Sequence, residues 1–227
     1  MDELEIPEEN NKDKLYNLVR GGLGAIPFVG SIASETFGLI LAAPISKRRN
    51  MWMEAVVEKL SEIENEQSGF INTLKENDEF ISFLLESSQI AFKTHQQEKL
   101  EILKNTIKNF FLDNTVEYDR KYSFLKVIDE ISPTHLKILY FIAKYEDYII
   151  ENITSYPQLI VKYNEIDEID NFYFRKCVVD LENQSLIRVS KDFADFYGGG
   201  GFATDEGAPS IKVLDFGLQF IEFIKQK

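Results

Sequence analysis

Residues 132–145, SPTHLKILYFIAKY, are the stretch that decides the fold. Ser132 followed by Pro133 is a typical helix start, because serine caps the first backbone amides and proline suits the first helical turn. The inward-facing side chains of this helix recur at helical spacing: Leu136, Leu139, Tyr140 and Ala143. The stretch therefore predicts a helix that opens a new domain at residue 131.

Downstream of this helix, residues 131–227 are expected to form a winged-helix domain. A short helix around 157–163 precedes a helix that starts at the cap Asp170 and runs through Leu181. Segments 186–190 and 210–214 alternate between apolar and polar residues like strands, and 216–225 predicts a last helix. The loop between the strands contains Gly198–Gly201, which we interpret as a wing tip, since a phosphate-binding loop needs Lys and Ser or Thr before a helix.

Upstream, residues 12–130 are expected to form an antiparallel helical bundle, and the fold class is mainly α. A short helix is expected over 12–20, and Asn77 and Asp78 look like a stop and an N-cap. Residues 1–11 are acidic and are expected to be a disordered tail without a cleaved signal. Four amphipathic stripes carry the bundle: Trp52, Val56, Leu60 and Ile63; Phe80, Phe83, Leu84, Ser87, Ala91 and Phe92; Leu100, Leu103, Ile107 and Phe110; Tyr118, Tyr122, Leu125 and Ile128.

An apolar, glycine-rich segment at 21–45, GGLGAIPFVGSIASETFGLILAAPI, contains Glu35 as its only charge. We expect an apolar hairpin here, with Pro44 ending a helix. Small residues recur at a strict spacing of four, which on a helix makes a stripe where another backbone approaches closely. The stripe consists of Gly30, Ser34, Gly38 and Ala42.

This stripe has two interpretations. In the first it touches a membrane, because about 20 apolar residues can cross a bilayer, and Lys47, Arg48, Arg49 and Trp52 suit a membrane interface. In the second interpretation the stripe packs inside the helical bundle of a soluble protein or on a partner helix, because a charged Glu35 in mid-bilayer would cost about 2.5–3.5 kcal/mol. A segment buried at rest and exposed on triggering satisfies both.

The charge balance weakens a nucleic-acid interpretation. The chain has 25 Lys or Arg against 38 Asp or Glu, a net charge of −13, and residues 130–227 hold ten basic against 16 acidic residues. Phosphate binding needs clustered positive charge. The helix that would read bases offers four side chains, which we interpret instead as a protein-docking face: Phe172, Tyr173, Arg175 and Lys176.

No catalytic or metal-binding constellation is found in the sequence. The two histidines, His95 and His135, lie 40 positions apart, and no zinc-binding spacing is present. The single cysteine, Cys177, lies on an inward stripe and is expected to be buried; one cysteine also favours a reducing compartment. We therefore expect no cofactor, no metal, no small-molecule substrate and no enzymatic activity.

The stretch at 132–139, Ser-Pro followed by Leu139, together with the preceding helical region, resembles bacterial Abi-alpha-type proteins, which are associated with abortive infection. The likeness covers residues 70–145 and the general layout. It implies a bacterial, phage-defence setting and carries over no catalytic residue.

Together these observations predict a non-enzymatic bacterial interaction or effector protein, related to phage defence or toxins. Its small-residue helix would pack on a protein partner, on a second copy or on a membrane, and its winged helix would dock or sense. The alternative is a winged-helix DNA-binding transcriptional regulator. The expected location is the cytoplasm, with peripheral attachment to the inner membrane left open.

Overall fold

The computed structural model describes residues 16–17, 19–21, 35–74, 77–112, 116–190 and 210–226. It is mainly helical with one small sheet, which confirms the predicted fold class at that level. The expected acidic tail 1–11, residues Gly30 and Ser34, and the glycine run 198–201 lie outside the described residues. Of the helix expected over 12–20, the described residues 16–17 and 19–20 are helical.

The chain divides into two compact units, Met1–Leu125 with Lys225–Lys227, and Lys126–Ile224. The described helices of the first unit are α2 (Glu35–Glu66), α3 (Phe70–Leu74), α4 (Asp78–Lys93), α5 (Gln97–Leu112) and α6 (Tyr118–Glu130), the last of which continues into the second unit. The second unit holds α7 (Pro133–Lys144), α8 (Glu146–Asn152), α9 (Tyr156–Asn164), α10 (Asn171–Asn183), β1 (Ile187–Val189), β2 (Ile211–Val213) and α11 (Asp215–Ile224).

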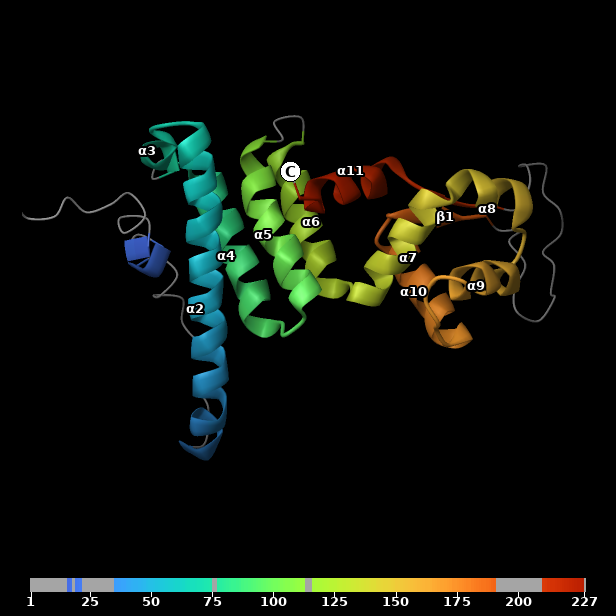
Figure 1. Ribbon diagram of the computed structural model, residues 1–227, viewed down its shortest axis with the longest axis horizontal. Helices are drawn as coiled ribbons and strands as arrows, with labels where there is room; N and C mark the ends of the chain where they lie inside the picture. The colour runs from blue at the N-terminus through green and yellow to red at the C-terminus, as the bar shows by residue number, and fades with distance from the viewer. Residues whose placement is uncertain are drawn as a thin grey trace, which may run out of the picture. The chain divides into compact units, whose positions relative to one another are not determined.

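In the first unit, α2 lies along α4 and α5 (Figure 1). The apolar face predicted from Trp52, Val56, Leu60 and Ile63 is buried, each side chain being at most 2% exposed. Phenylalanines of α4 and α5 close the core, with the rings of Phe83 and Phe110 4.8 Å apart. Burying each such side chain contributes about 1.5–3 kcal/mol, so this face holds α2 on the α4–α5 pair.

The prediction that Pro44 ends a helix is wrong, because α2 runs continuously from Glu35 to Glu66 with Pro44 inside it. Proline removes one backbone hydrogen bond and costs about 3 kcal/mol within a helix. Strong helix formers surround it, among them Leu41, Ala42 and Ala43, and their propensity keeps the helix intact. A second, smaller correction concerns Asn77, which caps α4 itself by accepting from the Phe80 amide at 2.9 Å.

The first helix that lies wholly in the second unit is α7, which starts at the predicted Pro133 behind Ser132. Asp170 caps α10 as predicted, its carboxylate accepting from the amides of Phe172 and Tyr173 at 3.0 Å each. The two predicted strands pair antiparallel, with Arg188 opposite Lys212. Helix α8 and, in the first unit, the short α3 were not predicted, since neither is long enough to show a helical period.

Candidate functional site

The basic residues predicted to matter lie in the middle of α2, at the level where α4 ends. Arg48 donates from Nη1 to the carbonyl oxygens of Phe92 and Lys93, both at 3.4 Å, and the Arg49 guanidinium lies 5.4 Å from the Phe92 ring centroid. A cation is favourable at a helix C-terminus, where the backbone dipole is negative. Arg48 and Arg49 therefore fasten α2 to the end of α4, whereas Lys47 is exposed.

Trp52 belongs to the core of the first unit. Its side chain is 2% exposed, and its indole N–H donates to Ser88 Oγ on α4 at 2.8 Å. Ser88 in turn donates to the Leu84 carbonyl at 2.6 Å. This arrangement fixes the ring between α2 and α4, so in this conformation the indole is not available to a membrane surface.

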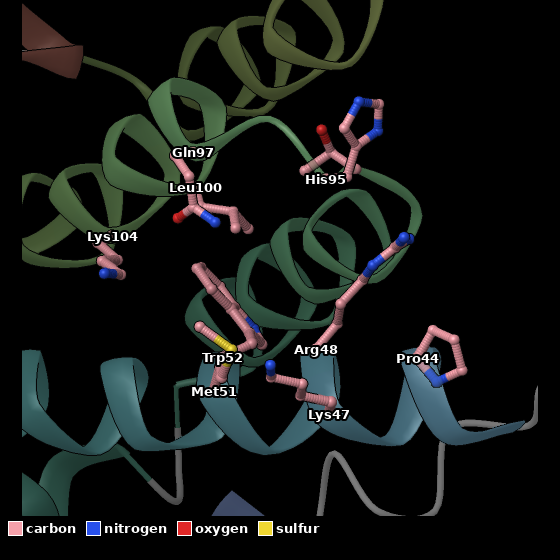
Figure 2. A pocket seen from close by; sticks show the side chains of 10 residues that line it. Pro44, Lys47, Arg48, Met51, Trp52, His95, Gln97, Leu100 and Lys104 are labelled. Atoms are coloured by element: carbon pink, nitrogen blue, oxygen red, sulfur yellow. The ribbon is translucent and has the colours of Figure 1, made fainter.

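A cavity of about 310 Å³ opens beside this tryptophan (Figure 2). It lies between α2, the turn that joins α4 to α5, and the first turns of α5. Its lining combines four basic side chains with apolar and uncharged polar ones and contains no Asp or Glu: Pro44, Lys47, Arg48, Met51, Trp52, Thr94, His95, Gln97, Leu100 and Lys104. Three residues that the sequence singled out, Lys47, Arg48 and Trp52, thus meet in one cavity.

Residues of the α4–α5 turn and of α5 complete this cavity and were not identified from the sequence. His95, Leu100 and Lys104 come from positions far along the chain from Lys47. The one sequence signal for the turn was the polar break between the second and third apolar stripes, where His95 lies. Hydrophobic periodicity does not show which turn lies opposite which helix. The cavity could therefore be identified only from the structure.

The amino-terminal part of α2 continues past the turn between α4 and α5 (Figure 1). Arg48 of α2 lies beside Lys93, the last residue of α4. At a rise of 1.5 Å per residue, residues 35–47 of α2 therefore extend about 20 Å beyond the end of α4. Gly38 and Ala42 of the predicted small-residue stripe are in this extension. No helix in the described ranges is long and apolar enough to cross a bilayer.

The proposed docking residues of the second unit lie together on α10. Phe172 and Tyr173 are 66% and 44% exposed. The two cations beside them are engaged by their own unit: Lys176 binds Asp180 at 2.5 Å, and the Arg175 guanidinium lies 5.3 Å from the Tyr156 ring centroid. This face of α10 is therefore aromatic, with its positive charge partly neutralised.

A wider, more open groove in the second unit is lined by aromatic rings, among them Tyr140 of α7, Tyr145 between α7 and α8, and Tyr163 of α9. Two of its three ionic groups pair with each other, since Lys137 binds Asp167 at 2.8 Å, and the third, Lys144, lies 5.2 Å from the Tyr145 ring centroid. The hydrogen bond from Lys137 lowers the pKa of Asp167, and burial, followed by the neighbouring Asp167, raises the pKa of Tyr163 to about 12. The ion pair joins α7 to the segment between α9 and α10 and leaves the groove without a concentrated charge.

Within the described ranges, no cluster of His, Cys, Asp and Glu side chains could hold a metal ion. His135, one of the two histidines, is used in structure: its Nδ1 accepts from the Ser132 amide at 3.1 Å, and its Nε2 lies 3.1 Å from Asp180 Oδ2. Cys177 is fully buried, and burial raises the pKa of its thiol to about 11. A buried, protonated thiol is a poor nucleophile.

Comparison with known proteins found no matching family model, no matching curated protein and no matching solved structure.

Proposed function

We propose that the protein is a non-enzymatic bacterial interaction or effector protein that docks through the amino-terminal part of α2. The observation that carries the proposal is the continuation of α2 past the α4–α5 turn as a helix whose sequence, ETFGLILAAPIS at 35–46, is almost wholly apolar. An apolar helix gains free energy when a partner covers it.

A helical protein partner fits this extension better than a bilayer does. Gly38 and Ala42 leave room for a second backbone to approach closely, which is how small residues at a spacing of four act in helix pairs. Glu35 begins the same helix and opposes insertion into hydrocarbon. The partner that carries a matching small-residue stripe is α2 of a second copy, so we propose self-association through this helix.

Sedimentation velocity over a range of concentrations tests this proposal. The wild type is expected to dimerise, and Gly38→Leu is expected to weaken the dimer by blocking close approach. Ser82→Leu, on the exposed face of α4, is the matched control and should leave the dimer intact. If the protein is monomeric and sediments with anionic vesicles, the α2 extension binds a membrane instead of a second copy. If the protein neither dimerises nor binds vesicles, the proposal is refuted.

We further propose that the second unit is a winged helix used for docking. Its support is the order of elements, three main helices α7, α9 and α10 followed by the antiparallel pair of β1 and β2. The exposed Phe172 and Tyr173 on α10 suit a protein surface, because aromatic side chains are enriched in interfaces. Fold alone does not decide between protein docking and DNA binding, so the aromatic face of α10 is what favours docking.

The alternative function is a DNA-binding regulator. It is disfavoured because Lys176 is paired with Asp180, and because the surrounding sequence is acidic. A gel shift with salt titration decides: we expect no binding, and binding with a steep salt slope would favour the regulator.

A role in phage defence is the broadest part of the proposal and is supported by the resemblance of residues 70–145 to Abi-alpha-type proteins. A phage challenge of cells with and without the gene tests it. Protection that is lost in Gly38→Leu would connect the defence to the α2 extension, and equal plating efficiency with and without the gene would remove the defence role.

A further inference from the structure

The cavity beside Trp52 concentrates positive charge in a strongly acidic protein. The chain has a net charge of −13, yet the cations Lys47, Arg48 and Lys104 line this one cavity together with the imidazole of His95, and no carboxylate lines it. In Figure 2, Lys47, Arg48 and His95 lie toward one end and Lys104 toward the other. Low-dielectric walls strengthen the field of such a group, so the cavity attracts anions that the rest of the surface repels.

Three of these side chains, Lys47, Arg48 and His95, retain capacity for a ligand. Neither Lys47 nor His95 has a hydrogen-bond or ionic partner within the described part of the chain, and both are exposed. Arg48 uses only Nη1 in its two 3.4 Å bonds to backbone carbonyls, and a guanidinium carries five N–H donors. At the other end, Lys104 is paired with Glu101 at 2.8 Å and is half-buried.

Between these two ends, the lining is mostly apolar. Trp52, Met51 and Leu100 lie between Lys104 and the other basic side chains in Figure 2, with the uncharged Gln97 beside Leu100. The indole N–H of Trp52 is already bound to Ser88, so the ring supplies hydrocarbon and no donor. A purely inorganic anion would leave these side chains uncovered, and a purely apolar ligand would leave Lys47 and Arg48 without a counter-charge.

We infer that this cavity binds a small amphipathic anion, a phosphate monoester or carboxylate joined to a short apolar tail. The anionic head lies between Lys47, Arg48 and His95, and the tail lies on Trp52 and Leu100. A volume of about 310 Å³ is at the lower end of ligand pockets, which favours a short chain over a bulky ligand. This binding does not depend on self-association through α2 and goes beyond it.

The protein contains a single tryptophan, so the fluorescence of Trp52 reports on the cavity directly. The experiment titrates the full chain with octyl phosphate below its critical micelle concentration. Two controls separate the contributions: inorganic phosphate supplies the anionic head alone, and octyl glucoside supplies an uncharged amphiphile. We expect saturable one-to-one binding of octyl phosphate that weakens with added salt, and much weaker binding of the other two.

Three variants locate the binding site. Lys47→Gln and Lys104→Gln should each weaken octyl phosphate binding, the first by about tenfold, because a charge-assisted contact is lost. Lys108→Gln is the matched control, since Lys108 lies one turn further along α5, also pairs with glutamates, and does not line the cavity. Far-UV circular dichroism checks that each variant is folded.

The inference is overturned if octyl phosphate does not saturate, if octyl glucoside binds equally well, or if Lys108→Gln weakens binding as much as Lys47→Gln. A further arm distinguishes the source of the ligand: phosphatidylglycerol vesicles that shift Trp52 fluorescence in a Lys47-dependent way identify a lipid headgroup, and vesicles without effect identify a free ligand. Gly38→Leu should bind octyl phosphate normally, so failure of this inference and failure of the α2 proposal are distinguishable.

Discussion

His135 on α7 and Asp180 on α10 meet through a 3.1 Å contact between Nε2 and Oδ2, which joins two helices 45 positions apart. Because Nδ1 accepts from the Ser132 amide, Nε2 carries the proton and donates to the carboxylate. Asp180 also accepts from Lys176. One carboxylate thus links the start of α7, through its capping histidine, to the last turn of α10.

Asp180→Asn should destabilise the protein near neutral pH by about 1 kcal/mol, through the loss of hydrogen bonds to a charged acceptor. The hydrogen bond from Lys176, and after it that from His135, lowers the pKa of Asp180 below its ordinary value of 3.8. A lowered pKa gives stability that is present above the ordinary value and is lost as the pH falls through the folded value. Urea unfolding should show the wild type and the variant converging toward pH 3, and an equal difference at pH 7 and pH 3 would contradict this.

Alkali should destabilise the second unit through Cys177 and Tyr163. Burial, the largest cause for both groups, raises the pKa of Cys177 from 9.0 to about 11 and that of Tyr163 from 10.0 to about 12. Raised values give stability that is complete below the ordinary pKa and is lost as the pH rises through the folded pKa. Tyr163→Phe should therefore lose less stability than the wild type between pH 10 and pH 12 in urea unfolding. Tyr148→Phe, at an exposed tyrosine, should follow the wild-type profile.

Gly217→Ala should destabilise the second unit strongly. A Cβ at this position would lie 2.1 Å from the carbonyl oxygen of Leu186 and 2.8 Å from Val213 Cγ1, so the start of α11 would have to move away from the sheet. Overpacking of this kind typically costs about 1–3 kcal/mol or more. Thermal unfolding measures the loss. Gly21→Ala is the control, since a Cβ there meets nothing within 4 Å, and a loss as large as that of Gly217→Ala would contradict the steric explanation.

Ser88→Ala should cost about 1–3 kcal/mol, because it leaves the buried indole N–H of Trp52 without its acceptor. Tryptophan fluorescence during urea unfolding gives both the stability and the changed environment of the ring. Ser61→Ala removes a similar hydroxyl, one that bonds only within its own helix to the Val57 carbonyl, and should stay within about 0.5 kcal/mol of the wild type. Equal effects of the two variants would show that the Trp52–Ser88 bond contributes little.

Much of the helical framework could be predicted because local chemistry marks it. Ser132-Pro133 and Asp170 mark the starts of α7 and α10, and those helices begin there. Asp170 accepts from the first backbone amides of α10. The paired strands follow from alternation at 187–189 and 211–213. Pro44 was misjudged because a proline is a local signal for a helix end, whereas the helix formers on both sides determined the outcome.

The candidate cavity could be predicted only in part. Lys47, Arg48 and Trp52 stood out by charge and type, but their partners His95 and Lys104 reach them only after α4 and α5 pack on α2. Trp52 was associated with a membrane interface because its neighbours are basic. The helical spacing that also placed Trp52 on the apolar stripe with Val56 predicted its burial correctly.

The burial of Cys177 has a practical consequence for spectroscopy. It is the chain's one thiol, it has no exposed surface, and burial raises its pKa. Maleimide reagents near neutral pH should therefore not react with it. A cysteine introduced at Ser46, on the exposed side of α2, can then carry a spin label or dye in the otherwise natural sequence. Distances between two such labels would locate the neighbour of this helix in solution.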